Sequence, residues 1–363
     1  MVYIDKKYKF FEYFNNENGR MMRSGIIKDK KDTGIDPFMR SFPSLLDIGI
    51  MGTCKNKKYC TVGCYQGNNE MENMSLDNFK SIIDQAKNKT MQVAIGGLGS
   101  PNEHPDFVEI IKYAKENGII PSYTTSGIEL TDEQIEATKS SAGAVAVSFY
   151  KTKYSDDATK RFLEAGIKTN IHYVLGNDSI DEAILRLRTN AFPEGINAVI
   201  FLLYKPVGCI KQNNVLQYND PRVSEFFKLI DEEHPFKVGL DACSVPGVLN
   251  FSKKVDKISI TACDGSRFSA YITPDNYMLP CSFDTTTRNY AVSLNDFSMK
   301  EAWESDTFEK FRSIHRNSCI GCSDKADCHG GCPIAKDITL CQRGEKNHAN
   351  PQNTKSNSCS KKE

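Results

Sequence analysis

The chain has 363 residues, with 46 Lys or Arg and 46 Asp or Glu, so its formal net charge at pH 7 is zero. Such a chain has no global attraction for nucleic acid or an anionic membrane, and no apolar stretch approaches the roughly 20 residues of a membrane-spanning helix. Residues 1–14 mix charged and aromatic side chains and lack the apolar segment of a signal peptide. We therefore expect a cytoplasmic protein of two domains, with no nucleic-acid partner and no membrane contact.

Residues 1–44 read as an extension ahead of the first domain. An aromatic segment at residues 7–14 and a second segment at residues 19–27 flank the turn-rich stretch 15–18, which predicts a hairpin. We expect this extension to pack as a cover over the domain that follows. The alternative is that it holds a peptide by adding a strand.

From residue 45 the chain alternates between two kinds of segment. Six apolar, β-branched runs are each followed by a stretch with helical periodicity. The predicted strands are residues 45–51, 92–97, 119–125, 144–150, 169–175 and 196–203, and the predicted helices are 76–86, 104–117, 131–140, 155–166, 179–190 and 220–233. Thr131 with Gln134, and Ser179 with Glu182, have the spacing of capping boxes at two of the helix starts.

The spacing of these segments predicts the fold class. A repeat of about 25 residues fits strand–helix units of a parallel sheet. Six units joined by right-handed crossovers form an α/β fold that closes into a partial (β/α)6 barrel over residues 45–235, and a doubly wound open sheet is the rival. In a barrel the loops after the strands carry the active site.

Three cysteines, Cys54, Cys60 and Cys64, follow the first predicted strand. Clustered cysteines in a reducing compartment bind metal or perform redox chemistry more often than they form disulfides. A [4Fe–4S] cluster normally takes four thiolates, so three thiolates leave one iron open to an exogenous ligand. The alternative is a zinc site completed by a distant residue.

Residues 236–345 form a second predicted region, followed by a polar, disordered tail at 346–363. A hairpin turns at Pro274–Asn276, where Asn276 can take a left-handed conformation, and residues 299–314 have the pattern of one amphipathic helix. The cysteines of this region are Cys263, Cys281, Cys319, Cys322, Cys328, Cys332 and Cys341, which indicate metal, either iron–sulfur or zinc. By default we interpret Cys209 and Cys243 as small buried hydrophobic residues. Cys359 is predicted to lie in the disordered tail without a function.

The cysteine triad on a predicted barrel, with Tyr65 after its last cysteine, resembles the cluster loop of radical S-adenosylmethionine enzymes. The resemblance implies a partial (β/α)6 barrel whose open iron chelates S-adenosylmethionine. The family's usual spacing is three residues and then two, whereas here it is five and then three. The remaining positions that match the family's cofactor site are Gly96, Gly97, Gly99 and Ser148, the last as a ribose contact, although the family's glutamate is missing from the glycine motif.

The C-terminal spacing resembles the SPASM domain of one branch of that superfamily, with Asn276 where glycine is usual. The resemblance implies two auxiliary [4Fe–4S] clusters. One would be held by Cys319, Cys322, Cys328 and Cys341, and the other by Cys263, Cys281 and Cys332. The fourth ligand of the second cluster is either Cys243 or an open position that binds substrate.

The resemblance also implies a reaction. Reductive cleavage of S-adenosylmethionine gives a 5′-deoxyadenosyl radical that removes a hydrogen atom from the substrate, and members with this extra domain commonly modify peptides or proteins. We therefore expect a peptide or protein substrate and an electron donor such as flavodoxin or ferredoxin. His172 could touch substrate, although a satisfied core histidine is the favoured interpretation. The alternatives are a radical enzyme acting on a small metabolite and a non-catalytic, zinc-stabilised binding protein.

Overall fold

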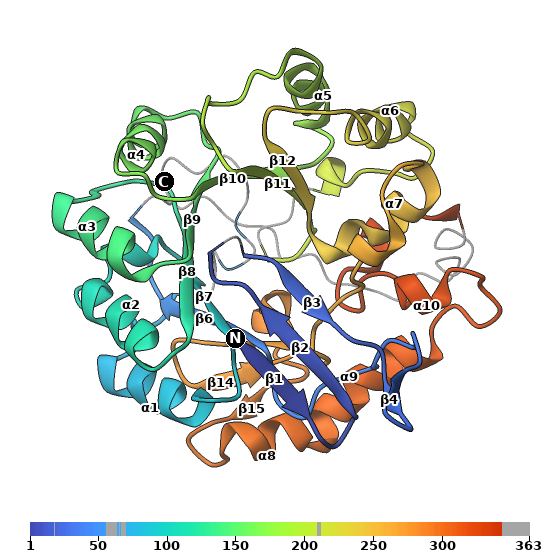
Figure 1. The fold of residues 1–363 in the computed structure, drawn as a ribbon. Helices are drawn as coiled ribbons and strands as arrows, with labels where there is room; N and C mark the ends of the chain where they lie inside the picture. Colours follow the sequence, from blue (N-terminus) through green and yellow to red (C-terminus); the bar gives the residue numbers. More distant parts are fainter. Residues whose placement is uncertain (18, 56–63, 65, 67–69, 209–211, 343–363) are drawn as a thin grey trace.

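The computed structural model describes residues 1–17, 19–55, 64, 66, 70–208 and 212–342 (Figure 1). Its centre is a ten-stranded sheet with the strand order β12-β11-β10-β9-β8-β7-β6-β13-β14-β15. The strands are β6 (Leu45–Met51), β7 (Gln92–Gly97), β8 (Ile120–Thr125), β9 (Ala144–Ser148), β10 (Thr169–Leu175), β11 (Ala198–Leu203), β12 (Lys237–Leu240), β13 (Ser269–Ile272), β14 (Tyr277–Leu279) and β15 (Val292–Ser293).

All neighbouring pairs from β6 to β12 are parallel, and the order along the sheet follows the order along the chain. A doubly wound sheet reverses its order partway, so this monotonic order favours the partial barrel over its rival. The crossover helices lie on the outside of the curved sheet (Figure 1). They are α1 (Leu76–Ala86), α2 (Phe107–Glu116), α3 (Asp132–Ser141), α4 (Lys153–Glu164), α5 (Ile180–Thr189) and α6 (Pro221–Leu229).

The two predicted capping boxes have different outcomes. At α3 the Thr131 side chain accepts a hydrogen bond from the Gln134 amide, and the Gln134 side chain accepts one from the Thr131 amide, as predicted. At α5 the prediction is wrong, since Ser179 is the N-cap but its hydroxyl donates to the Val174 carbonyl instead. Glu182 forms ion pairs with basic side chains, which compete for its carboxylate.

The sheet continues across the predicted boundary at residue 235. Strand β12 pairs with β11, and β13 adds to the other side of β6 in parallel before turning back through β14 and β15. Asn276 has φ 63° in the β13–β14 turn, as expected. The domain limits remain predictions, but the C-terminal region shares its backbone hydrogen bonding with the barrel.

The prediction of one continuous helix at residues 299–314 is wrong. It is divided into α8 (Met299–Glu304) and α9 (Asp306–Asn317) by Ser305, whose backbone is extended at ψ 155°. The Ser305 hydroxyl accepts a hydrogen bond from the Phe308 amide and so caps the second helix. The other helices of the C-terminal half are α7 (Val245–Phe251) and α10 (Lys325–Cys328).

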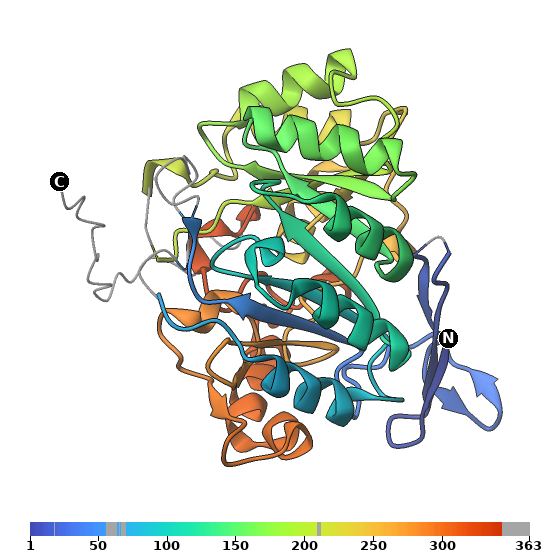
Figure 2. The ribbon, with the colours of Figure 1, turned by 90° about the vertical axis from the view of Figure 1, so that its left-hand side faces the viewer.

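The N-terminal extension contains the predicted hairpin, one further strand paired with it, and a separate pair of short strands. Its strands are β1 (Val2–Asp5), β2 (Phe10–Phe14) and β3 (Met21–Arg23) in one sheet, with β4 (Ile27–Lys28) and β5 (Lys31–Asp32) as a separate pair. Phe14 packs against Met91 and Ile120, at the points where β7 and β8 begin. The extension therefore covers the amino ends of the strands, away from the loops that follow them (Figure 2). None of the described helices is long and apolar enough to cross a membrane.

Candidate active site and cluster sites

The chain leaves β6 directly into the loop that carries the first cysteines. Gly52 donates its amide to Asn73 Oδ1 at 2.9 Å and accepts the Met71 amide at 2.9 Å, so the two ends of the loop are joined. Cys54 and Cys64 both lie on this loop and are half-buried. Cys60 and Tyr65 lie outside the described residues. The loop thus starts at the carboxyl end of the barrel, where the sequence predicts the active site.

The glycines after β7 lie against the cysteine loop. A Cβ on Gly97 would lie 2.4 Å from the Met51 carbonyl oxygen, and one on Gly99 would lie 2.3 Å from the Thr53 carbonyl oxygen and 3.3 Å from Cys54 Cα. Gly97 also has φ 126°, a conformation that glycine adopts readily. By contrast, a Cβ on Gly96 would meet nothing within 4 Å. Gly97 and Gly99 bring the two loops together, and Gly96 leaves space beside the backbone.

The turn after β7 is also tied to the loop after β8. Ser100 Oγ lies 2.8 Å from Ser126 Oγ and accepts the Ser126 amide at 2.9 Å. The Thr125 hydroxyl donates to Asn102 Oδ1 at 2.6 Å, and the Asn102 amide group donates to the Ile128 carbonyl at 2.8 Å. These buried bonds fix the glycine turn relative to the neighbouring strand.

Glu103 is a site candidate that sequence reasoning missed. It ends a short 3₁₀ turn (Pro101–Glu103), and its two buried carboxylate oxygens lie near the Lys55 and Ser100 amides without forming a well-aligned hydrogen bond to any described residue. Burial raises the pKa of the Glu103 carboxyl, and the nearby Lys55 amide, on the cysteine loop, opposes this shift. A buried carboxylate without a partner costs free energy unless a ligand satisfies it. The available signal was an acidic residue four positions after Gly99.

Ser148 and His172 lie side by side inside the barrel. They are paired in the β9–β10 register, and alternate residues of β10 pack outward against the helices. His172 Nδ1 lies 3.3 Å from Thr124 Oγ1. Burial lowers the pKa of His172 to about 4, so the ring is neutral at pH 7. His172 is thus a neutral, half-buried ring on the inner face of the barrel.

Asp47 and Tyr271 face the interior from neighbouring strands. They are paired in the β6–β13 register, and the Tyr271 hydroxyl lies 2.2 Å from where a Cβ on Gly49 would stand. Gln66, on the cysteine loop, donates its side-chain amide to this hydroxyl at 3.3 Å. Burial raises the pKa of Asp47 to about 7. The inner face of β6 therefore carries the titratable Asp47 carboxyl next to Tyr271, which contacts the cysteine loop through Gln66.

Four cysteines from distant parts of the sequence lie close enough for their thiols to influence one another. The Cys243 thiol is hydrogen-bonded to that of Cys332, and this contact, followed by burial, raises its pKa. Burial first, and then the charge of Cys243, raises the pKa of Cys263 to about 12. Burial raises the pKa of Cys281 as well, with further contributions from Cys263 and Cys243. Cys243 packs against the hydrophobic core, as its default interpretation expects, and it also lies beside Cys332.

A second group of cysteines gathers near the carboxyl end of the described chain. Burial raises the pKa of Cys328, and the charges of Cys319 and Cys341 add to the effect. The Cys322 amide donates to the Cys319 carbonyl at 3.1 Å. Gly330 and Gly331, both with positive φ, direct their amides towards the Cys328 sulfur. Amides that converge in this way favour an anionic centre.

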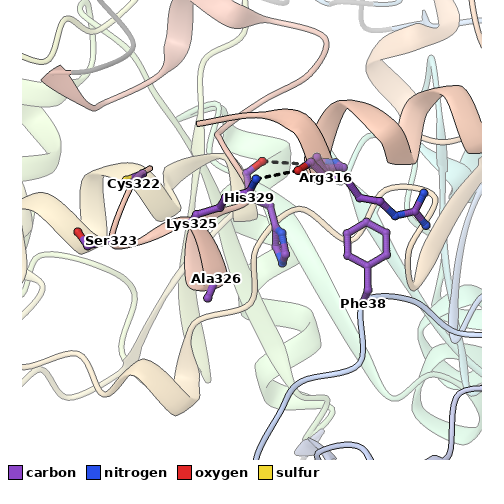
Figure 3. A pocket seen from close by; sticks show the side chains of 8 residues that line it. Phe38, Arg316, Cys322, Ser323, Lys325, Ala326 and His329 are labelled. Carbon is purple, nitrogen blue, oxygen red and sulfur yellow. Dashed lines mark hydrogen bonds between the residues drawn. The ribbon is translucent and has the colours of Figure 1, made fainter. Parts of the chain in front are cut away.

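A surface hollow of about 490 Å³ adjoins this second group. Figure 3 shows its lining side chains, with Cys322 at one end and Phe38 at the other. Arg316 lies over the Phe38 ring at 4.5 Å, and the Lys325 ammonium donates to the Arg316 carbonyl at 2.8 Å. The hollow places one cysteine of the group at the protein surface.

The donor sets fit iron–sulfur clusters. Each group supplies cysteine sulfur from a buried or half-buried position, and thiolates are the ligands of such clusters. Within the described residues, no three His, Cys, Asp or Glu side chains are arranged to hold a single metal ion. None of the ten cysteines with described positions forms a disulfide. The first group also fits, since its two described members, Cys54 and Cys64, lie on one loop.

Comparison with known proteins identifies the C-terminal region first. Residues 263–329 match the model of the SPASM family, an iron–sulfur cluster-binding domain. Mycofactocin maturase MftC of Mycolicibacterium smegmatis is 24% identical over an alignment of 347 positions, which covers 85% of this chain and 84% of the relative.

Solved structures show the same fold. Streptococcus suis SuiB bound to S-adenosylmethionine superposes with a TM-score of 0.67 at 18% identity, covering 84% of this chain and 78% of SuiB. SuiB bound to its precursor peptide SuiA gives 0.65 at 19% identity, covering 84% and 77% of the two chains. The protein anSMEcpe with bound AdoMet gives 0.60 at 15% identity, covering 83% of this chain and 95% of that one.

Proposed function

As a radical S-adenosylmethionine protein with a C-terminal SPASM iron–sulfur domain, the chain is, we propose, an enzyme that modifies a peptide or protein. One observation carries the proposal. The loop with Cys54 and Cys64 leaves the carboxyl end of β6 and lies against Gly97, which ends β7, and Gly99, which follows it. This packing supports a cluster and its ligand at the mouth of a parallel barrel, where the strand ends converge.

We propose that Cys54, Cys60 and Cys64 hold a [4Fe–4S] cluster with one open iron, which binds S-adenosylmethionine. When bound, the cluster and S-adenosylmethionine together would supply a 5′-deoxyadenosyl radical that removes a hydrogen atom from the substrate. The protein's own part is to position the two molecules and to exclude water.

The residues beside the loop have separate roles in this proposal. Gly96 leaves room for the ligand to approach the backbone, and Glu103 accepts hydrogen bonds from the ligand's ammonium group in place of the family's glutamate. Gly97 and Gly99 keep the loop close, and Ser148 contacts the ribose from the end of β9. A carboxylate and an ammonium group form charge-assisted hydrogen bonds, which are about twice as strong as neutral ones.

We propose that the SPASM region holds two auxiliary [4Fe–4S] clusters. Cys243, with its hydrogen bond to Cys332, supports a complete four-cysteine set for one of them rather than an open position. The ligand sets are Cys243, Cys263, Cys281 and Cys332 for one cluster, and Cys319, Cys322, Cys328 and Cys341 for the other. Metal binding would displace the thiol protons that the raised pKa values retain.

The relatives support a peptide substrate. MftC is described as a maturase, and SuiB has been solved with a precursor peptide. We propose a peptide or protein substrate in the barrel mouth, beside Ser148 and His172, and flavodoxin or ferredoxin as the electron donor. The N-terminal sheet covers the opposite end of the strands, which favours a covering role over capture of a peptide near the reaction.

The test is anaerobic reconstitution with iron and sulfide, followed by reduction in the presence of S-adenosylmethionine. We expect a brown protein with about 12 irons and formation of 5′-deoxyadenosine. The triple variant Cys54→Ala/Cys60→Ala/Cys64→Ala should lose the product and about four irons. A colourless zinc protein, or product formation by the triple variant, would refute the proposal. Acceleration by small metabolites but not by precursor-type peptides would reject the peptide substrate alone.

A further inference from the structure

We propose that the outer face of the N-terminal sheet is a contact surface between two copies of this chain, which pair through it about a two-fold axis. The outer face consists of Val2, Ile4, Phe11, Tyr13 and Met22. This inference stands apart from the proposed function, because it requires neither a cluster nor a substrate. It concerns the end of the barrel opposite to the cysteine loop.

The central strand of this sheet is apolar on both of its faces. On the inner face of β2, Phe10 and Phe14 are at most 2% exposed. On the outer face, Phe11 and Tyr13 are 45% and 37% exposed. Glu12, the only charged residue of the strand, is buried on the inner face. A sheet with one buried face normally carries polar side chains on the other, so β2 reverses the usual arrangement.

The neighbouring strands extend the outer face. In the β1–β2 register Val2 pairs with Tyr13 and Ile4 pairs with Phe11, and in the β2–β3 register Met22 pairs with Tyr13. Cross-strand partners project to the same side of a sheet, so the five side chains form one patch. Val2, Ile4 and Met22 are 67%, 66% and 51% exposed. Five of the eleven exposed large apolar side chains in the described chain therefore gather here.

No part of the chain that the structure describes covers this patch. Figure 2 shows the N-terminal strands at the margin of the molecule, with the barrel on one side of them only. The longest stretch outside the described residues, 343–363, contains no Val, Ile, Leu, Met, Phe, Tyr or Trp. That stretch has no large apolar side chains to match those of the patch, so a second molecule is needed to cover it.

The size of the patch fits a small symmetric interface. A fully exposed large side chain presents roughly 150–200 Å², so the five exposed fractions give about 500 Å² per copy. A pair would bury about 1,000 Å², which is near the lower limit of a specific protein interface. We therefore expect a reversible dimer with a dissociation constant on the order of 10 µM.

The composition of the patch favours a second copy over a charged partner. The outer face of the three strands carries no charged side chain, so it offers no counter-charge to an acidic or basic peptide. Its aromatic side chains lie on the central strand and its aliphatic side chains on the two outer strands. A two-fold contact uses the same surface on both copies, so the aromatic centre of one copy meets that of the other. Two such faces pack as aligned sheets about 10 Å apart.

This mode of pairing leaves both active sites accessible. The N-terminal sheet lies where β7 and β8 begin, and the cysteine loop leaves the carboxyl end of β6. The two barrel mouths would therefore point away from the interface. Neither copy contributes to the other's site, so the dimer and the monomer should have the same activity per chain.

The experiment is sedimentation velocity of the full-length protein, reconstituted anaerobically with iron and sulfide. Between about 1 and 200 µM, the wild type should pass from the 40.7 kDa monomer to a species of twice that mass. Phe11→Lys/Tyr13→Lys places like charges at the centre of the pair, so it should weaken association by about a hundredfold or more and stay monomeric. The matched control is Leu185→Lys on α5, an exposed apolar residue outside the patch, which should leave association unchanged.

A charge exchange tests the two-fold contact directly. Phe11→Lys/Tyr13→Lys and Phe11→Glu/Tyr13→Glu should each be monomeric alone. An equal mixture of the two should form dimers, because opposite charges then face each other across the interface. If either double variant fails to fold, the single variants Tyr13→Lys and Tyr13→Glu provide the same comparison.

Three results would overturn the proposal. They are a wild type that stays monomeric up to about 200 µM, an equal mixture that does not associate, and a Leu185→Lys variant that dissociates as the patch variants do. Flotation of the wild type with phosphatidylcholine vesicles, lost in Phe11→Lys/Tyr13→Lys, would assign the patch to a membrane surface instead.

The 5′-deoxyadenosine assay separates this inference from the proposed function. The monomeric variant should form the product at the wild-type rate per chain. A wild type that dimerises but forms no product would refute the proposed function and leave the interface in place.

Discussion

Asp47 and His172 occupy the inner face of the barrel, and burial acts on them in opposite directions. The pKa of Asp47 is raised to about 7, so its proton is retained up to neutral pH in the folded state. The pKa of His172 is lowered to about 4, so this ring remains neutral well below pH 6.5. In both cases the neutral form is favoured, as expected where few counter-charges stand beside a group removed from bulk water.

The first prediction concerns the stability cost of Asp47. Below pH 4 the carboxyl is protonated in both states, and between pH 4 and 7 only the unfolded state loses its proton. The free energy of unfolding therefore falls as the pH rises through this window. Asp47→Asn should remove this fall, so that its gain over wild type grows with pH from pH 4 and reaches roughly 2–4 kcal/mol at pH 8. Urea denaturation of the protein at several pH values measures it.

The control for this prediction is Asp157→Asn, on the exposed face of α4, which should change stability by about 0.5 kcal/mol or less. An Asp47→Asn variant with the same pH dependence as wild type would show that lumen water fully solvates the carboxylate.

The second prediction concerns Glu103, whose carboxylate is buried beside the cysteine loop. Glu103→Gln removes a buried charge without shortening the side chain, so thermal stability should be unchanged or higher. Loss of a charged hydrogen bond should weaken S-adenosylmethionine binding by roughly tenfold to a hundredfold. Calorimetric titration of the reconstituted protein measures the dissociation constant.

Glu109→Gln, in an exposed pair with Lys80 on α2, is the matched control and should leave binding unchanged. Equal affinity in the Glu103 variant and wild type would remove Glu103 from the ligand site. A loss of both affinity and stability would point to a structural role instead.

At the scale of elements, the N-terminal sheet is attached to the barrel by a buried charge network. Glu12 on β2 pairs with Arg40 at 3.3 Å and with Arg23 at 3.0 Å, and Glu12 and Arg40 have fully buried side chains. Arg40 donates to the Lys89 carbonyl at 2.6 Å, and its own carbonyl accepts the Trp303 indole N–H at 3.0 Å. One arginine thus joins the extension, the barrel and α8.

The third prediction follows from this network. Glu12→Ala leaves Arg40 buried without its carboxylate partner, and removal of one member of a buried pair typically costs about 3–5 kcal/mol. Chemical denaturation should show that loss, and hydrogen exchange should show faster exchange in β1, β2 and β3. Glu17→Ala, at an exposed position of the same extension, should have little effect. A Glu12 variant as stable as wild type would mean that the sheet is held by its apolar contacts alone.

At the scale of the whole molecule, one continuous core extends from the barrel into the C-terminal region. Cys332, Ile338 and Leu340 belong to the same buried cluster as the barrel strands and their helices. Regular structure is nevertheless sparse between residues 319 and 341, where α10 has four residues and is followed by a short 3₁₀ turn. Such a segment depends on its metal more than the barrel does.

The fourth prediction is the result of removing iron. Anaerobic chelation should increase hydrogen exchange in residues 319–341, while β6 to β11 remain protected, because the barrel has its own apolar core. Mass spectrometry of the holo and iron-free forms measures this difference. Uniform loss of protection across the barrel would mean that the clusters stabilise the entire fold.

The sequence alone determined the parallel strand–helix order and the hairpin turn at Asn276, and it predicts metal binding by the cysteine groups. These features depend on local periodicity and spacing, which a linear chain displays directly. Only the tertiary structure brings the Cys243 thiol beside that of Cys332 and buries Glu103 beside Lys55. It also places Lys205 between the segments that carry Cys243 and Cys281. The residues in these contacts lie far apart in sequence, so their chemistry depends on which strand ends the fold brings to one side of the sheet.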